Sequence, residues 1–233
     1  MPAATQPSAA VRSTLDRRKA GAVYRRPATT SLPSVPLRAA DADPDPLAQF
    51  TRWFGEARAA GVYEPEAMAL ATASADGVPS ARMVLLKGHD ERGLVFFTNY
   101  RSRKGRELES NPRAALLFHW KELGRQVRVE GGVTRVTREE TESYARTRSR
   151  GSRLGALASP QSEVVAGRDE LEQRVREAAA AHPDDVPTAE WWGGYRLAPS
   201  TWEFWQHGED RLHDRLRYSV RPGGGWVVER LAP

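Results

Sequence analysis

Basic side chains at two places in the sequence have the types and spacing to bind an anion. Arg82 and Lys87 bracket the apolar run RMVLLK, and Ser102 with the following Arg and Lys opens a short helical pattern. Free N–H groups and the dipole at a helix start favour a phosphate, and adjacent cations add to that preference. These residues therefore indicate a phosphate site.

A third basic group lies near the end of the chain, in TWEFWQHGEDRLHDRLRY, where Arg211, His213 and Arg215 alternate. Alternation in an extended segment predicts that the three side chains lie on one face of a strand over 211–220. Each basic group alone is open to the simpler interpretation of a solvated surface. Together with Gln126 and Gln161, they indicate a ligand that carries phosphate, or two such ligands.

The sequence offers no reactive group of its own for catalysis. It has no cysteine, which excludes thiolate chemistry and cysteine-based metal sites, and its five histidines form neither HxxxH nor HExxH. GxSxG is absent, and paired carboxylates occur on polar helical runs such as REETE. We expect no metal site, and a chain that binds phosphates without a nucleophile is expected to take its chemistry from a cofactor.

Composition and charge are those of a globular protein with a basic N-terminal arm. Hydrophobic residues make up 39% and charged residues 28% of 233 residues, and no apolar run reaches the ~18 residues of a membrane span. We expect a cytoplasmic protein without membrane contact. Of the 35 Lys and Arg, seven lie in the first forty residues beside one acidic residue. We interpret this arm as a solvated tail rather than a nucleic-acid site.

Periodicity and turn residues predict one mainly β domain over 43–233, preceded by a loosely attached or disordered arm over 1–42. Asp45 and Pro46 predict the start of an amphipathic helix that Gly61 ends. Short apolar runs separated by turn residues predict about seven antiparallel strands. Further helices are expected from Ser102, from Thr137 with a capping box, and, as a solvated helix, over 167–182. This pattern favours a β-barrel with peripheral helices (α+β) over a parallel sheet.

Several segments resemble the pyridoxamine 5′-phosphate oxidase family, in consistent order from about Asp45 to Pro233. They are RMVLLKGHDERGLVFFTNYRSRKGRELESNPRAALLFHW, RQVRVEG, SPQS, WWGGYRL and EFWQHGEDRLHDR. The resemblance implies an FMN-binding split β-barrel and a homodimer with FMN at its interface. It implies oxidation of pyridoxamine or pyridoxine 5′-phosphate to pyridoxal 5′-phosphate, an oxidoreductase reaction at a CH–NH2 group with O2 as acceptor and H2O2 as product.

The resemblance also implies the residues of the site. Those expected to bind FMN are Arg82, Met83, Val84, Leu85, Leu86, Lys87, Phe97, Thr98, Arg103, Lys104, Gln126, Gln161, Ser162, Trp205 and Arg215. Those expected to bind the substrate are Lys87, Tyr144, Arg148, Ser152, Arg211 and His213. Arg211 and His213 are also the expected catalytic residues, over the pyridine ring. Some of these residues are expected to come from the partner subunit.

Four departures from the family pattern concern the substrate side. The segment Thr29–Leu32 reads TTSL where the family often has a lid of the form Arg-x-x-Tyr, Phe97 replaces a frequent Tyr, and His119 and His207 replace other residue types. They motivate an alternative, an FMN-dependent oxidase of secondary metabolism of the phenazine-pathway type. A third alternative, supported by the basic arm, is a flavin-binding or nucleic-acid-binding module without turnover.

Overall fold

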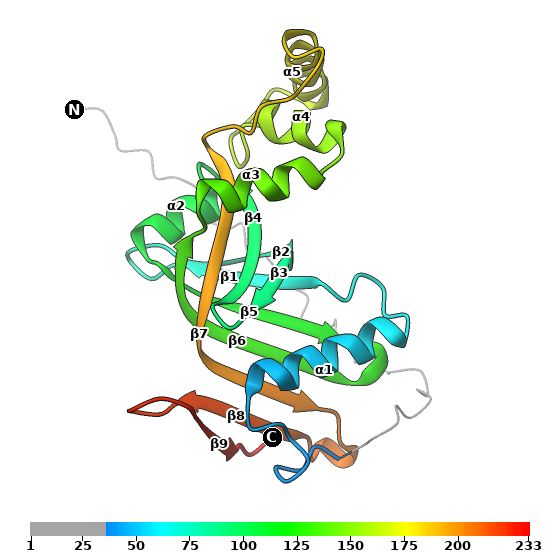
Figure 1. Ribbon diagram of the computed structural model, residues 1–233, viewed down its shortest axis with the longest axis vertical. Helices are drawn as coiled ribbons and strands as arrows, with labels where there is room; N and C mark the ends of the chain where they lie inside the picture. The colour runs from blue at the N-terminus through cyan, green and yellow to red at the C-terminus, as the bar shows by residue number, and fades with distance from the viewer. Residues whose placement is uncertain (1–35) are drawn as a thin grey trace, which may run out of the picture. The chain divides into compact units, whose positions relative to one another are not determined.

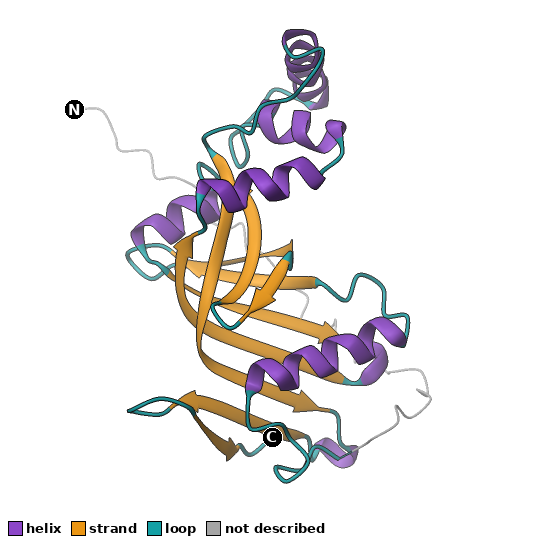
Figure 2. Cartoon of the chain, in the orientation of Figure 1, coloured by secondary structure: helices purple, strands orange, loops and turns teal. Residues whose placement is uncertain are grey.

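The structure is a computed structural model that describes residues 36–233. Most of the predicted arm, including Thr29–Leu32, therefore lies outside the described residues. The elements of the described part are shown in Figures 1 and 2. In chain order they are α1 (Pro46–Ala59), β1 (Ala67–Ala73), β2 (Pro79–Leu85), β3 (Gly88–Asp90), β4 (Gly93–Asn99), α2 (Arg103–Ser110), β5 (Arg113–Trp120), η1 (Lys121–Leu123), β6 (Arg125–Arg135), α3 (Arg138–Thr147), α4 (Arg150–Ala158), α5 (Arg168–Ala181), β7 (Trp192–Gln206), η2 (Glu209–Arg211), β8 (Asp214–Val220) and β9 (Trp226–Arg230).

Helix α1 begins as its sequence predicts and covers one face of the sheet. The Asp45 carboxylate accepts the N–H of Leu47, and Pro46 occupies the first turn. Phe50 is fully buried on the side that faces the strands, and its ring centroid lies 5.0 Å from that of Phe118 and 5.4 Å from that of Trp202. The helix therefore closes the hydrophobic core over β5 and β7 (Figure 1).

The strands of the described residues form one antiparallel sheet in the order β2-β1-β5-β6-β7-β4-β3, and β8 and β9 continue from β7. Strand β7 pairs with β6 along most of its length, with β4 through its first half and with β8 through its second half. The sheet curls so that the chain after β2 returns to β4, where the N–H of Lys87 donates to the carbonyl of Val95 over 2.8 Å. The prediction of a mainly β fold with peripheral helices is confirmed.

The two faces of the sheet differ in what covers them. One face carries the aromatic core, whose largest fully buried members include Trp120, Trp202, Tyr218, Phe118 and Phe204. Burial of each such ring contributes roughly 1.5–3 kcal/mol, which makes this face the main source of stability. On the opposite face, Met83 and Leu117 are 63% and 36% exposed. Their cross-strand row leads through Ala69 and on to Arg128 and Glu203, so this face passes from apolar to charged.

Helices α2 to α5 gather at the end of the sheet where β4 ends and β7 begins (Figure 2). Two predicted caps are confirmed. The Ser102 hydroxyl accepts the N–H of Gly105, and Thr137 and Glu140 form a capping box at the start of α3. Helix α5 has no buried residue, in agreement with its predicted solvated character. Helix α4 was not predicted, and the Ser149 side chain caps it at the N–H of Ser152.

The prediction of one continuous strand over 211–220 is wrong at its start. Strand β8 begins at Asp214, and Arg211 belongs to the short turn η2, where its φ is +65°. After β7 the chain doubles back at Gly208 so tightly that a Cβ there would lie 2.1 Å from the carbonyl oxygen of Leu212. Because the chain turns here, Arg211 does not lie on the strand face that carries Arg215.

The described start of the chain is attached to the domain. Leu37 is buried, its N–H donates to Asp214 over 3.0 Å, and its carbonyl accepts from Arg230 over 2.8 Å. Residues 36–42, which were predicted to belong to the arm, thus include a segment that packs against β8 and β9.

Candidate active site

A cavity of about 520 Å³ lies between the edge strand β2, strand β4 and the corner where α3 meets α4. Its lining is mixed: apolar side chains from β2 lie opposite cations and hydroxyl groups from the helices. The lining residues are Met83, Val84, Leu85, Lys87, Phe97, Thr98, Lys104, Tyr144, Thr147, Arg148, Ser149, Ser152, Gln161 and Trp192. The structure thus brings together most of the residues predicted for the cofactor and four of those predicted for the substrate, with Lys87 belonging to both sets.

One end of the cavity is built around the ammonium group of Lys104. Its Nζ donates to Thr98 Oγ1 over 3.1 Å and to Gln161 Oε1 over 3.0 Å. Lys104 is 8% exposed although it lies in the first turn of α2, and the capping residue Ser102 donates its hydroxyl to the carbonyl of Asn99 beside it. Burial, followed by the charge of Arg82, lowers the pKa of Lys104. A buried cation beside a helix start is suited to bind an anion.

Aromatic rings form one wall of the cavity. The Phe97 ring stacks on Tyr144 with centroids 4.0 Å apart and on Trp192 at 5.5 Å. Phe97 is admitted by Gly194, where a Cβ would lie 2.9 Å from its ring. The guanidinium carbon of Arg148 lies 4.5 Å from the Trp192 centroid. This wall can take up a flat ring beside a fixed positive charge.

Tyr144, Arg148 and Ser152 converge at the α3–α4 corner. Tyr144 lies on α3, Arg148 caps its C-terminal end, and Ser152 is in the first turn of α4. The Ser149 hydroxyl donates to the Ser152 hydroxyl over 2.9 Å. Burial raises the pKa of Tyr144, which therefore keeps its proton near neutral pH, and burial lowers the pKa of Arg148. Hydroxyl groups beside a guanidinium at a helix start are chemically suited to bind a second anion.

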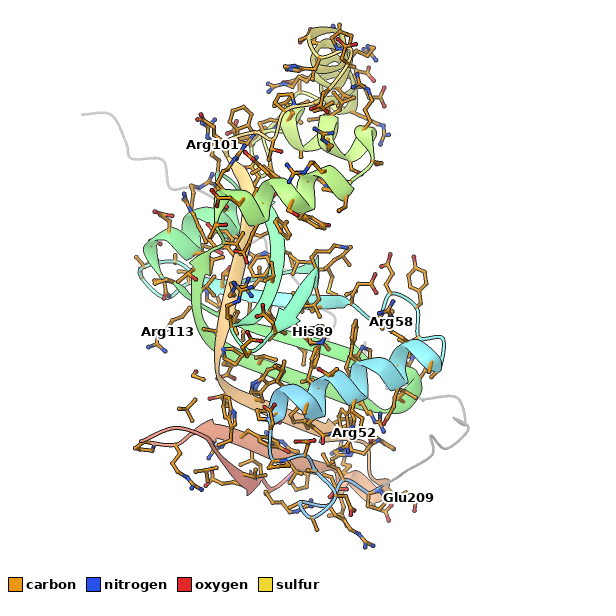
Figure 3. The ribbon with its side chains drawn as sticks, viewed as in Figure 1. Arg52, Arg58, His89, Arg101, Arg113 and Glu209 are labelled. Atoms are coloured by element: carbon orange, nitrogen blue, oxygen red, sulfur yellow. The ribbon has the colours of Figure 1, made fainter. Side chains whose placement is uncertain are left out.

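Five of the predicted residues form a separate group at the other end of the sheet. Gln126, Trp205 and Arg215 are cross-strand neighbours in one row of β6, β7 and β8. The ring of His213 lies 4.6 Å from that of Trp205, and Arg211 is nearby in η2. None of these five lines the cavity. Figure 3 shows the separation: Arg101, just before α2, and Glu209, in η2, lie far apart in the view.

The turn between β7 and β8 holds His213 in a defined state. The N–H of Gly208 donates to His213 Nδ1 over 3.1 Å, so the proton of the neutral ring is on Nε2. Burial, followed by the charges of His207 and Arg211, lowers the pKa of His213. The rings of His207 and His213 are 5.3 Å apart. His213 therefore presents a neutral imidazole with a donating Nε2.

Four other predicted residues lie outside the cavity lining. Arg82 points from β2 toward α2, and Arg103 is half exposed on α2; both are ion-paired with Glu107. Leu86 is buried in the core, and Ser162 lies in the exposed loop after α4 with φ of +75°. Arg82 and Arg103 thus lie close to Lys104 but do not line the cavity themselves.

Sequence reasoning missed Trp192, Glu107 and the cap Ser149. Trp192 is one of two adjacent tryptophans followed by two glycines, which is a signal of close packing but not of a site. Glu107 reads as one more acid on a polar helix, although its carboxylate is buried. Among the described residues no cluster of metal-ligand side chains occurs, and no helix is long and apolar enough to span a membrane.

Comparison with known proteins identifies related chains along nearly the whole described length. Residues 54–182 match the family described as pyridoxamine 5′-phosphate oxidase, and residues 192–233 match its C-terminal dimerisation region, described as that of pyridoxine 5′-phosphate oxidase. The pyridoxine/pyridoxamine 5′-phosphate oxidase of Cupriavidus taiwanensis is 57% identical over 197 residues, 84% of this chain and 93% of that protein. Its namesake in Rubrobacter xylanophilus is 60% identical over 193 residues, 82% of this chain and 88% of that protein.

Solved structures agree with this assignment. PhzG of Burkholderia lata, in complex with tetrahydrophenazine-1-carboxylic acid, superposes with a TM-score of 0.81 at 35% identity and covers 88% of this chain and 100% of its own. A related FMN-binding protein of Nostoc punctiforme, 19% identical, shares the fold with a TM-score of 0.65 over 81% of this chain and 98% of its own. The curled antiparallel sheet is thus the expected split barrel, and the chain belongs to the pyridoxamine 5′-phosphate oxidase family.

Proposed function

We propose that this chain is an FMN-dependent oxidase that converts pyridoxamine or pyridoxine 5′-phosphate to pyridoxal 5′-phosphate, with O2 as acceptor and H2O2 as product. The observation that carries the proposal is a single cavity lined both by the buried ammonium group of Lys104 and by the guanidinium of Arg148, each suited to bind a phosphate. A phosphorylated flavin beside a phosphorylated pyridine requires two such groups. Both ligands are soluble phosphates, which fits the cytoplasmic location proposed for the protein.

The donors present fit the phosphate and ring of FMN. Lys104, with Arg82 and Arg103 beside it, would hold the phosphate, because a dianion needs several cationic donors. Met83 to Leu85 and Phe97 offer apolar surface for a flat ring. Bound FMN would supply the two-electron oxidation, and the chain supplies binding, orientation and electrostatics.

The α3–α4 corner would hold the substrate phosphate. Arg148 and the hydroxyl groups of Tyr144 and Ser152 supply charge and hydrogen bonds, and Lys87 lines the same cavity. The protonated phenol of Tyr144 remains a donor at neutral pH because burial raises its pKa. A substrate without phosphate would leave this set of donors unused.

We propose that a second copy of the chain completes the site. Residues 192–233 match a dimerisation region, and the open sheet face carries exposed Met83 and Leu117. In a symmetric dimer, the Trp205 and Arg211 end of one chain would lie against the Lys104 end of its partner. Gln126, Trp205 and Arg215 would then contact the flavin. Arg211 and the donating Nε2 of His213 would orient the pyridine ring.

A phenazine-type oxidase is the second candidate, because the PhzG structure is similar over its whole length and binds a tricyclic carboxylate. His207, beside His213, would change the substrate side in that direction. The Tyr144, Arg148 and Ser152 corner favours the phosphate substrate. A non-catalytic flavin-binding or nucleic-acid-binding module would not need that corner.

One experiment separates these candidates. The purified protein is examined for the absorbance of bound FMN, and pyridoxal phosphate and H2O2 are then assayed with pyridoxamine phosphate, pyridoxine phosphate and tetrahydrophenazine-1-carboxylic acid. We expect bound FMN and turnover of one or both vitamer phosphates. Absence of flavin would exclude both oxidases, and flavin with turnover of the phenazine substrate alone would replace the proposal by the second candidate.

A further inference from the structure

Glu107 lies at the centre of a buried polar network beside the flavin end of the cavity. It is on α2, one turn after Arg103, and its side chain is 7% exposed. Its Oε1 accepts from Arg103 Nε over 2.8 Å, and its Oε2 accepts from Ser80 Oγ over 2.6 Å and from Thr72 Oγ1. A carboxylate with this many donors is held in one position.

The same network holds Arg82. Its guanidinium donates to Glu107 over 3.3 Å, to Ser80 Oγ and Thr72 Oγ1, and to the carbonyl of Leu70 over 3.2 Å. The two hydroxyl groups therefore accept from Arg82 and donate to Glu107. Arg82 is therefore connected to the Glu107 carboxylate directly and through both hydroxyl groups, so the position of the carboxylate affects the orientation of Arg82.

Three cations meet at this point of the fold. Burial lowers the pKa of Lys104, the charge of Arg82 lowers it further, and the charge of Glu107 acts in the opposite direction. Without the carboxylate, three buried or half-buried cations would repel one another, and Arg103, already half exposed, would turn toward solvent.

We propose that Glu107 is a positioning residue that holds Arg82 and Arg103 in place for the phosphate of the cofactor without contacting the cofactor itself. This inference rests on the proposed function. Long cationic side chains lose rotamer freedom when they bind an anion, and a side chain that is already ordered loses less. Side chains that contact a phosphate bind it more tightly when hydrogen bonds from other residues already hold them in position.

Glu107 could have the opposite effect if its charge mattered more than its position. As a competing anion it would weaken phosphate binding, and its removal would tighten it. The geometry favours positioning, because the hydroxyl groups of Thr72 and Ser80 both donate to Oε2 and hold the carboxylate in place. The sign of the change in affinity therefore tests the proposal.

The test compares the affinities of the full-length apoprotein for FMN and for riboflavin, which lacks the phosphate. In Glu107→Gln we expect FMN to bind at least about tenfold more weakly while riboflavin affinity changes less than about twofold. The matched control is Glu109→Gln on the same helix, whose exposed carboxylate pairs with Arg135. It should leave both affinities unchanged.

A milder variant separates position from charge and guards against misfolding of Glu107→Gln. Ser80→Ala keeps every charge but removes one hydroxyl group that holds both Glu107 and Arg82. We expect a smaller, phosphate-dependent loss of FMN affinity. Unchanged or tighter FMN binding in both variants, or an equal loss for FMN and riboflavin, would overturn the inference. If wild-type protein binds no FMN, the proposed function fails as well, so the two failures are distinguishable.

Discussion

At the scale of single residues, burial rather than residue type distinguishes the side chains that matter. Glu107 and Glu109 are two positions apart on α2, yet the first is buried and the second is 67% exposed at its side chain. Burial alone would raise the pKa of Glu107, but hydrogen bonds from Ser80, Thr72 and Arg103 outweigh it and lower the pKa to about 2. The carboxylate therefore stabilises the fold as well as the site.

This shift predicts a specific acid sensitivity. The pKa of Glu107 is lower in the folded protein than the value of 4.5 of an unperturbed glutamate. Its contribution, of order 3 kcal/mol, is thus present above about pH 4.5 and is lost as the pH falls toward 2. Urea unfolding of wild type and Glu107→Gln should give free energies of unfolding that converge as the pH falls from about 4.5 toward 2. A gap that stays constant over this range would contradict the assignment.

Arg211 is expected to affect turnover more than cofactor binding. It is exposed in η2, so Arg211→Leu should fold normally, while loss of a positioned guanidinium over the substrate should lower kcat/KM by about a hundredfold. FMN content should stay within about twofold of wild type. The control is Arg221→Leu in the exposed hairpin between β8 and β9, which should retain activity. Equal activity of the Arg211 variant would refute its role.

At the scale of elements, the cavity depends on how closely β7 and β4 approach. Gly194 on β7 faces Phe97 on β4, and a Cβ at Gly194 would lie 2.7 Å from Val136 and 2.9 Å from the Phe97 ring. The aromatic wall of Phe97, Tyr144 and Trp192 is therefore set by the absence of one side-chain atom.

Gly194→Ala should displace this wall. Overpacking of this kind costs about 1–3 kcal/mol, and the shifted Phe97 should also raise KM. Thermal unfolding and steady-state kinetics measure the two effects. Gly132→Ala on β6 is the matched control, since a Cβ there would have no atom within 4 Å. If both variants behave alike, close approach at Gly194 does not shape the cavity.

At the scale of the whole molecule, the open sheet face predicts that assembly and cofactor binding are coupled. Leu117 lies on this face but does not line the cavity. Leu117→Lys places a charge in the proposed interface and should raise the dimer dissociation constant at least about a hundredfold, with loss of FMN. Val164→Lys, at a fully exposed valine, is the control. Light scattering measures the dimer, and flavin absorbance measures bound FMN. A Leu117 variant that stayed dimeric and retained FMN would contradict the proposed dimer.

The two ends of the arm should differ in importance. All proposed site residues lie from Arg82 to Arg215, so deletion of residues 1–35 should leave activity unchanged. Deletion of residues 1–40 also removes Leu37, which is buried against β8 and β9, and should lower the melting temperature by about 5 °C. Equal melting temperatures for both deletions would show that Leu37 contributes no stability.

The sequence by itself determined the local features and the family. The caps at Asp45, Ser102 and Thr137 could be predicted because each is a hydrogen bond between residues two or three positions apart. Only the tertiary structure decided which groups meet. Thr72, Ser80 and Glu107 come from three elements, Trp192 reaches Phe97 through strand pairing, and a tight turn removes Arg211 from the strand that alternation predicts. Such contacts depend on how the sheet curls, and no pattern confined to one segment of the sequence records that.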